Sequence, residues 1–297
     1  MKKLLFIVNP MAGKGAYKTN FGETLYTLHA GGIVPTVRFT AGRGDATAIA
    51  EAEGADYDVV CCLGGDGTLS EVMEGIVRLP EPSRPPIGYI PLGTANDVAT
   101  TLNLPKNNML AAARRVLHGQ PMDFDVGTFA GAGTFTYVAA FGAFTDVSYE
   151  TPQQEKQALG HFAYVLEGMM RLPKITKYHA RVEYDNGVLE DDFLFGGVMN
   201  STSVAGLIHL NSDKIRLDDG LFELALVKSP KNIADLRAIL TDLRERTYDG
   251  RFIKLVPTSF ARFTFTQPVA WTRDGEDGGS FEQIELRNLN RAVKIIV

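Results

Sequence analysis

Residues 57–68 read YDVVCCLGGDGT. The apolar part predicts a buried strand, and three glycines within four positions follow it directly. Glycine permits backbone angles and close approaches that a side chain would block, and the start of a helix offers unpaired N–H groups to an anion. The stretch therefore predicts a strand–loop–helix unit of an α/β fold, with a loop suited to phosphate.

Asp66 lies inside this loop. Its negative charge would repel a phosphate unless a cation lay between the two groups. A carboxylate in a phosphate loop therefore implies Mg²⁺, which prefers oxygen ligands and bridges carboxylates and phosphates. Taken alone, the same residues also fit a plain Asp-Gly turn with a helix cap.

The first ~130 residues repeat this alternation of short apolar runs and helix-like stretches, which is typical of a mostly parallel sheet wrapped by helices. In such sheets ligands bind at the carboxyl ends of the strands. The predicted strands cover residues 4–8, 34–39, 58–63 and 87–90, and the predicted helices cover residues 17–30, 45–53, 68–78 and 107–118.

The pattern becomes mostly strand from about residue 122 onward. Residues 178–184 and 261–266 alternate apolar and polar side chains, and helices are predicted at 159–169 and 233–246. The predicted fold is α/β, with a nucleotide-binding α/β domain over 1–128 and a β-rich, sandwich-like domain over 129–297. The active site is expected in the cleft between them. The sequence leaves open whether the last strand, about 291–297, returns to the first domain.

Composition excludes several classes of protein. The 297 residues carry 30 Lys and Arg against 35 Asp and Glu, a net charge of −5, which argues against a nucleic-acid partner. The two cysteines, Cys61 and Cys62, are adjacent and form neither a disulfide framework nor a four-cysteine zinc site. No export signal or membrane-spanning run is visible, so we expect a cytoplasmic protein with peripheral lipid contact only.

Two more loops carry polar residues at predicted strand ends. Residues 91–97 read PLGTAND, where Thr94 or Asn96 is either a phosphate ligand or a helix cap and Asp97 adds a second carboxylate. Residues 9–15 read NPMAGKG, which lacks the spacing of a P-loop. A Walker-type ATPase is therefore not supported, and Lys14 also fits a solvated loop lysine.

The combination of Asn9-Pro10, the segment GGDGT at 64–68 with Glu71-Val72, and LGTAND at 92–97 resembles the diacylglycerol kinase catalytic family. More narrowly, it resembles soluble bacterial lipid kinases related to diacylglycerol and sphingosine kinases. NAD kinases share GGDGT, and the GT-x-ND segment favours the lipid branch. The resemblance covers essentially the whole chain.

The resemblance implies residues for ATP and Mg²⁺. Asp66, Asp97 and Asp125 would orient the ion through water, and Asp123 stays an alternative because it shares a strand face with Asp125. Contacts to ATP would come from Asn9, Thr40, Gly64, Gly65, Asp66, Gly67, Thr68, Leu69, Ser70 and Thr94.

Two downstream motifs match the same family. In residues 216–221, RLDDGL, Asp219 would hold a structural Mg²⁺ by its carboxylate, with Arg216 and Leu221 contributing backbone carbonyls. The alternative is an Asp-Gly hairpin. In Asp274-Gly275-Glu276 the glutamate would be the general base, and the alternative is a plain exposed loop residue.

The expected function is an ATP- and Mg²⁺-dependent lipid kinase, most directly one that converts diacylglycerol to phosphatidic acid. The alternatives are an NAD-kinase-like enzyme and a non-catalytic nucleotide- or lipid-binding protein. The acceptor would come from the inner membrane face, and a homodimer stays open. A few aromatic residues either line the lipid route or, as the pattern favours, form a sheet core: Phe135, Tyr137, Phe141 and Phe144.

Overall fold

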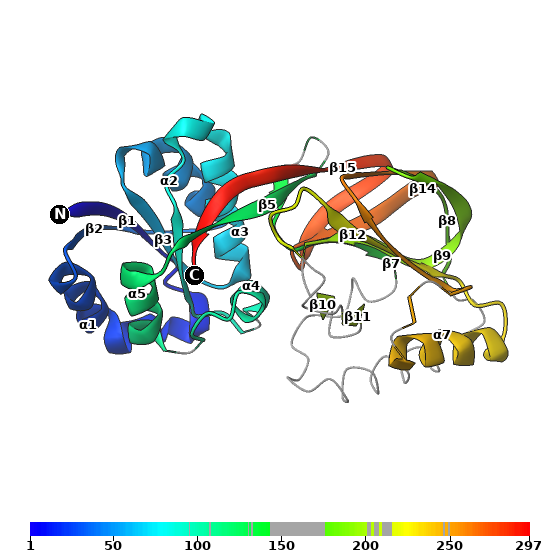
Figure 1. Cartoon of the computed structure of the whole chain (residues 1–297), viewed down its shortest axis with the longest axis horizontal. Coiled ribbons are helices and arrows are strands. Elements are labelled where there is room, and N and C mark those ends of the chain that lie inside the picture. The colour runs from blue at the N-terminus through cyan, green and yellow to red at the C-terminus, as the bar shows by residue number, and fades with distance from the viewer. Residues whose placement is uncertain are drawn as a thin grey trace. The chain divides into compact units, whose positions relative to one another are not determined.

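The computed structural model describes residues 1–94, 96–106, 108–129, 131, 133–142, 176–200, 203–204, 208–209, 216–245, 247–248 and 250–297. They form two compact units, the first made of Met1–Val126 with Asn290–Val297 and the second of Gly127–Leu289. The chain passes between the units within β5 (Pro121–Phe129) and again within β15 (Glu276–Ile296) (Figure 1). Residues 127 and 128 thus belong to the second unit, and the last eight residues to the first.

A parallel sheet is the centre of the first unit. Its strands lie in the order β4-β3-β1-β2. The end of β15 adds to this sheet beside β4, where Ile295 pairs in parallel with Ile87 of β4. The bounds are β1 (Lys2–Val8), β2 (Ile33–Phe39), β3 (Val59–Gly64) and β4 (Ile87–Pro91). Every residue of β3 and β4 is buried, as expected for a parallel sheet that is covered on both faces.

Helices cover the two faces of this sheet (Figure 1). α1 (Tyr17–Ala30) and α5 (Met109–His118) pack together, and their residues share a core with Leu4, Phe6 and Val8 of β1. α2 (Asp45–Glu53) and α3 (Asp66–Arg78) form the second pair. α2 occupies the space that a side chain at Gly75 would need, since a Cβ there would lie 2.5 Å from the Thr47 carbonyl oxygen. This close approach fixes α2 against α3.

The predicted α/β fold of the first half is confirmed. The strands predicted at 4–8, 34–39 and 87–90 lie within β1, β2 and β4, and the one predicted at 58–63 is β3 shifted by one residue. The predicted helices 17–30 and 45–53 coincide with α1 and α2. α3 begins two residues earlier than predicted, at Asp66. α5 begins at Met109 because the Asn108 side chain accepts a hydrogen bond from Ala111 N at 3.0 Å and caps the helix there.

Antiparallel strands dominate the second unit. Their order is β13-β12-β9-β7-β14-β15, and β8 pairs with both β9 and β14. The two long strands change partners along their length, since β9 and β14 pair with β8 over one half and with β7 over the other. The bounds are β6 (Gly133–Phe135), β7 (Val138–Gly142), β8 (Tyr178–Tyr184), β9 (Gly187–Met199), β12 (Phe222–Lys228), β13 (Ile253–Thr258) and β14 (Phe260–Arg273).

Two smaller elements complete the description of this unit. The helix α7 (Ile233–Glu245) lies where a helix was predicted, and a short pair joins β10 (Ser203–Val204) to β11 (Ile208–His209). The helix predicted at 159–169 lies outside the described residues. The β-rich character predicted for the second half is confirmed.

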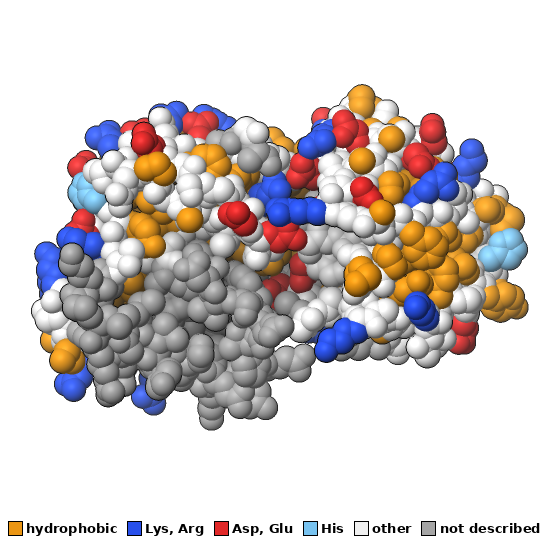
Figure 2. All heavy atoms as spheres, turned by 180° about the vertical axis from the view of Figure 1, so that it is seen from behind, with side chains coloured by type: hydrophobic (Ala, Val, Ile, Leu, Met, Phe, Trp, Pro, Cys, Tyr) orange, Lys and Arg blue, Asp and Glu red, His pale blue; other side chains and the backbone are white. Residues whose placement is uncertain are grey.

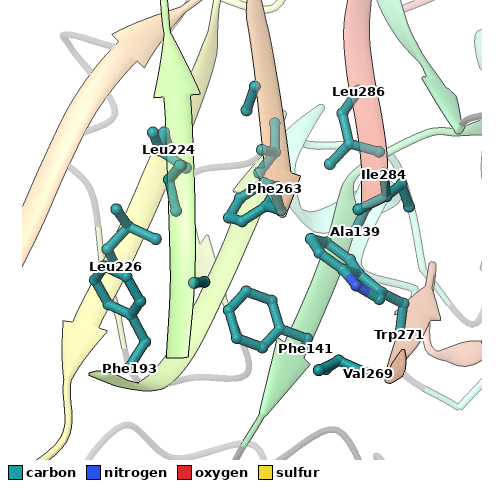
Figure 3. Packing of buried hydrophobic residues seen from close by; sticks show 14 of the residues in the cluster. Ala139, Phe141, Phe193, Leu224, Leu226, Phe263, Val269, Trp271, Ile284 and Leu286 are labelled. Atoms are coloured by element: carbon teal, nitrogen blue, oxygen red, sulfur yellow. The ribbon is translucent and has the colours of Figure 1, made fainter. Parts of the chain in front are cut away.

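Aromatic side chains fill the core of the second unit (Figure 3). Trp271 is 1% exposed, and its ring centroid lies 5.1 Å from Phe141 and 5.0 Å from Phe263. Aromatic pairs at such distances add stability beyond the burial of their area. Phe135, Tyr137 and Phe141 are buried here, which agrees with the sheet-core alternative, and Phe144 lies outside the described residues.

Both cysteines are buried free thiols on β3. Burial raises the pKa of each thiol well above its usual value, because a thiolate loses its hydration there. They are small buried residues of the core of the first unit.

Basic and acidic side chains are interspersed over the face that Figure 2 shows, rather than gathered by sign. No helix within the described ranges combines the length and the apolar character that crossing a membrane requires.

Candidate active site

Four loops meet at one edge of the first unit because its strands are parallel. Val8 of β1 is in register with Phe39 of β2 and Leu63 of β3, and Gly64 is in register with Pro91 of β4. The strands therefore end together, and the loops that follow them lie side by side at the carboxyl edge. This is the edge at which open α/β sheets bind ligands.

Glycines let these loops touch. A Cβ on Gly93 would lie 2.6 Å from the Cα of Gly65, so the loop after β4 packs directly on the loop after β3. A Cβ on Gly64 would meet the Thr68 side chain at 2.6 Å. Gly13 has a φ of 57°, and a Cβ there would lie 2.8 Å from the Leu92 carbonyl oxygen. Glycine is required because neighbouring backbone at Gly93 and Gly13, and the Thr68 side chain at Gly64, occupies the space that a Cβ would need.

Asn96 closes the loop after β4. It is 2% exposed and has a φ of 53°, a conformation that asparagine tolerates better than most residues. Its Oδ1 accepts a hydrogen bond from Gly93 N at 2.9 Å, and its Nδ2 donates to Gly93 O at 2.7 Å. Asn96 occupies the N-cap position of α4 (Asp97–Thr101), but its side chain does not cap that helix.

The Asp66 carboxylate caps α4 instead. Its Oδ2 accepts a hydrogen bond from Asp97 N at 3.0 Å, and its Oδ1 accepts one from Val98 N at 3.2 Å. A negative charge is stabilising at the first turn of a helix. Asp66 thus links the start of α3 to the loop after β4.

Burial changes the acid–base properties of two neighbours. Burial raises the pKa of the Asp97 carboxyl above its usual value, and the charge of Lys106 opposes that rise. Burial also raises the pKa of Tyr89, and the negative charges of Asp66 and Asp97 add to the effect. A cation near these carboxylates would therefore be favoured.

Thr68 connects α3 to the loop after β1. Its Oγ1 accepts a hydrogen bond from Asn9 Nδ2 at 2.9 Å, while Asn9 Oδ1 accepts one from Met11 N at 2.9 Å. Asn9 was expected from the family resemblance, and it lies at this edge. Thr40 follows β2, where its N–H donates to Val8 O at 3.0 Å.

Glu71 is the residue that sequence reasoning missed. Its two carboxylate oxygens accept hydrogen bonds from Gly44 N at 2.8 Å and from Ala46 N at 3.2 Å, which caps α2. Gly44, the N-cap residue of α2, has no side chain for this task and has a φ of 84°. The only signal in the sequence was that Glu71 is part of the GGDGT-x-x-E pattern.

One helix therefore organises the whole edge. Asp66, Thr68 and Glu71 all lie on α3, and each bonds to a different neighbouring loop. We call these three residues the α3 clamp. It ties the loops after β1, β2 and β4 to the loop after β3.

Exposure differs among the residues expected to contact a nucleotide. Thr40, Gly64, Thr68 and Leu69 are buried, Asn9, Gly65, Asp66, Gly67 and Ser70 are half-buried, and Thr94 is exposed.

Asp125 is fully buried on β5 and belongs to the first unit. Its Oδ1 accepts hydrogen bonds from Asn290 Nδ2 at 3.1 Å and from Arg291 N at 2.6 Å. Asp123 instead forms an ion pair with Lys294 at 3.0 Å. Among the described residues, no group of three or more His, Cys, Asp or Glu is arranged to hold a metal directly.

The turn proposed for a structural metal lies before β12 in the second unit. Arg216, Asp219 and Leu221 are exposed, and Asp219 Oδ1 accepts a hydrogen bond from Leu221 N at 3.0 Å. Burial raises the pKa of nearby Glu223, with a further contribution from the negative charge of Asp219. The turn thus presents oxygen atoms in a locally negative environment.

The segment Asp274-Gly275-Glu276 forms the tip of the β14–β15 hairpin. Arg273 pairs with Glu276, so the two residues between them make the turn. Glu276 is exposed and is the first residue of β15 rather than part of an irregular loop.

Comparison with known proteins finds relatives that match this chain in sequence. The model of the diacylglycerol kinase catalytic domain matches residues 3–129. A diacylglycerol kinase of Bacillus subtilis (strain 168) is 30% identical over 100% of this chain and 97% of its own length. A diacylglycerol kinase of Staphylococcus aureus (strain JH9) is 36% identical over 99% of this chain and 92% of its own length.

Solved structures agree in fold. A crystal structure from Bacillus anthracis (strain Sterne) has a TM-score of 0.79 at 26% identity and covers 99% of this chain and 95% of the solved chain. The chain belongs to the diacylglycerol kinase catalytic-domain family. It is therefore assigned as a kinase, as the motifs predicted.

Proposed function

We propose that this protein transfers the γ-phosphoryl group of ATP, with Mg²⁺, to a lipid hydroxyl, most directly that of diacylglycerol. The observation that supports this most is the α3 clamp, which gathers four loops at the ligand-binding edge of a parallel sheet in a chain of this family. Phosphoryl transfer depends mainly on positioning and charge stabilisation, so a site built from clamped loops suits it.

The loops fit the phosphates of ATP. Gly64, Gly65 and Gly93 let these loops pack so closely that a Cβ at any of them would meet a neighbouring residue. The N-terminus of α3 follows directly, and its N-cap residue Gly65 has no side chain to occupy it. Backbone N–H groups at such a helix start bind anions. In the proposed complex they hold the phosphates together with Asn9, Thr40, Thr94 and the residues of the Gly64–Thr68 loop, with Leu69 and Ser70 behind them.

The carboxylates fit a hard cation held mainly through water. Mg²⁺ accepts oxygen ligands and keeps several waters, so it needs only one or two protein carboxylates. Asp66 and Asp97 supply oxygen atoms at this edge, and Asp125 on β5 is proposed as a third carboxylate from the same unit. Burial raises the pKa of Asp97 although the charge of Lys106 opposes the rise, so a cation at this carboxylate would stabilise its charged form further.

Glu276 is proposed as the general base. It would take the proton of the lipid hydroxyl as that oxygen bonds to the γ-phosphorus and the bond from this phosphorus to the leaving ADP breaks; such proton transfer is typically worth ~10²–10⁴ in rate. The exposed carboxylate suits this role. The turn of Arg216, Asp219 and Leu221 would hold the structural Mg²⁺ with one carboxylate and two backbone carbonyls.

The acceptor is proposed to be a membrane lipid. The two bacterial relatives carry the name diacylglycerol kinase, which favours a glycerolipid over NAD or a purely binding role. The enzyme would work in the cytoplasm, at the inner face of the membrane, by peripheral contact.

The decisive experiment is a radiolabelled-ATP assay across diacylglycerol, a sphingoid base, a prenol and NAD, with and without Mg²⁺. We expect phosphate on diacylglycerol and only with Mg²⁺. Transfer to NAD alone, or nucleotide binding without any transfer, would contradict the proposal.

Asp66→Ala is expected to abolish turnover. The loss of its cap on α4 should cost only about 0.5–2 kcal/mol of stability, so the variant should stay folded by circular dichroism. Normal ATP-dependent phosphorylation by the folded variant would remove Asp66 from the mechanism.

A further inference from the structure

Asp274 is a buried carboxylate that the proposed reaction does not use. It is 6% exposed and precedes Glu276 by two residues at the tip of the β14–β15 hairpin. A buried charge is costly unless it is paired or hydrogen-bonded. Its partners therefore indicate what the burial achieves.

Three consecutive backbone N–H groups bind this carboxylate. Oδ2 accepts from Thr136 N at 2.7 Å, and Oδ1 accepts from Tyr137 N at 2.9 Å and from Val138 N at 3.1 Å. In return, Asp274 N donates to Val138 O at 2.8 Å. These charge-assisted bonds are stronger than neutral ones, and they fasten the hairpin tip to the segment between β6 and β7.

The backbone of Asp274 is constrained as well. Asp274 has a φ of 49° and Gly275 a φ of 79°, which are the two positive values of a type I′ turn. Aspartate is tolerated in this conformation better than most residues. The same residue thus sets the turn through its backbone and anchors it through its side chain.

Glu276 depends on this turn for its place. It pairs with Arg273 directly across the turn, and its own side chain is exposed. The turn residues Asp274 and Gly275 therefore set the position of Glu276, and the Asp274 side chain anchors that turn. Asp277, which follows Glu276, differs from Asp274 because it is exposed and bonds within the hairpin, where its Oδ1 accepts a hydrogen bond from Gly279 N at 2.9 Å.

We propose that Asp274 is a positioning residue that fixes Glu276 in its catalytic place by anchoring the hairpin tip to Thr136, Tyr137 and Val138. This inference rests on the proposed function, because it takes Glu276 as the base. Asp274 touches no substrate in this scheme and acts only through Glu276.

The test compares steady-state kinetics on ATP and diacylglycerol for the wild type, Asp274→Asn, Asp274→Ala and Glu276→Gln, with Asp277→Asn as the matched control. Asn keeps the turn conformation and one carbonyl acceptor. Because Asn replaces the charged acceptor by a neutral one and weakens the bonds to the three N–H groups, Asp274→Asn should lower kcat about 10- to 100-fold. Asp274→Ala should lower it further, and Asp277→Asn should match the wild type.

Two readouts separate positioning from general stability. The dissociation constant for ATP should not change in Asp274→Asn, because the phosphate loops belong to the other unit. The double variant Asp274→Asn/Glu276→Gln should be no slower than Glu276→Gln alone, since a residue that acts only through Glu276 adds nothing once Glu276 is gone.

Contradictory results have distinct meanings. Independent, multiplicative losses in the double variant, a kcat of Asp274→Asn equal to the wild type, or failure of both Asp274 variants to fold would each overturn the positioning role. An inactive wild type, or a Glu276→Gln variant with full activity, would instead overturn the proposed function.

Discussion

The carboxyl edge of the first unit and the hairpin tip of the second hold their acidic residues in different ways. At the edge, Asp66 caps α4 and Glu71 caps α2, so several separate contacts hold the loops in place. At the hairpin tip, one carboxylate, Asp274, receives three backbone N–H groups. A substitution at the edge should therefore loosen one loop contact at a time, whereas a substitution of Asp274 should release the whole hairpin tip.

The same contrast extends to what stabilises each unit. The edge relies on hydrogen bonds between loops, whereas the second unit surrounds its hairpin with packed aromatic rings. Removing a ring should thus affect stability far more than removing one loop contact.

The largest expected effect follows from Trp271→Ala. This side chain is 1% exposed and contacts Phe141 and Phe263, so its removal should destabilise the second unit by about 3–5 kcal/mol. Denaturant unfolding followed by far-UV circular dichroism measures the change. Trp271→Phe, which keeps an aromatic ring, should lose clearly less, and equal losses would argue against packing as the cause.

A smaller effect is expected for Glu71→Gln. The amide can accept with only one of its two terminal atoms, so either Gly44 N or Ala46 N loses its partner. The loop that carries Thr40 should loosen, and ATP should bind about tenfold more weakly, which corresponds to about 1.4 kcal/mol. Equilibrium titration with a fluorescent nucleotide analogue measures this.

Glu74→Gln is the matched control on the same helix. Glu74 pairs with the exposed side chain of Arg78 at 2.5 Å, and such surface pairs contribute about 0–1 kcal/mol. Its ATP affinity should equal that of the wild type. If both variants weakened ATP equally, the α3 clamp would not be the cause.

The smallest effect concerns the pH dependence of stability and Asp97. Because burial raises its folded-state pKa above the usual 3.8, the folded protein binds more protons than the unfolded chain just above that pH, and stability falls as pH rises through this window. Asp97→Asn removes the titrating carboxyl and therefore this decrease of stability with pH. Its Tm should exceed the wild-type Tm by a few degrees at pH 7 and match it near pH 3.

This substitution also tests the cation assignment. Asp97→Asn should lower activity while it raises stability, as expected where a carboxylate is retained for function. A variant that gained no stability at pH 7 would indicate that Lys106 already compensates the charge.

Much of the first unit could be predicted because its signals are local. The apolar runs at 4–8 and 58–63 mark buried strands, and the glycines of 64–67 mark a loop that needs backbone contact. Parallel strands then bring their loops to one edge by geometry alone. The predicted proximity of residues 64–68 and 92–97 follows from this, and the Gly65–Gly93 contact agrees with it.

The partners of the acidic residues could not be predicted in this way. Val98 lies 32 residues from Asp66 and Gly44 lies 27 residues from Glu71 along the chain, and no local pattern encodes such pairs. The Asp-Gly-Glu segment drew attention to its glutamate. The burial of Asp274 depends on β7, which is more than 130 residues away in sequence.

The two thiols on β3 have a practical consequence for spectroscopy. Since Cys61 and Cys62 are the protein's only cysteines and both are buried with raised pKa values, the native chain should resist maleimide reagents. A cysteine introduced on each unit could then carry a donor or an acceptor dye without background labelling. Energy transfer between the dyes would report how the separation of the two units responds to nucleotide and to lipid vesicles.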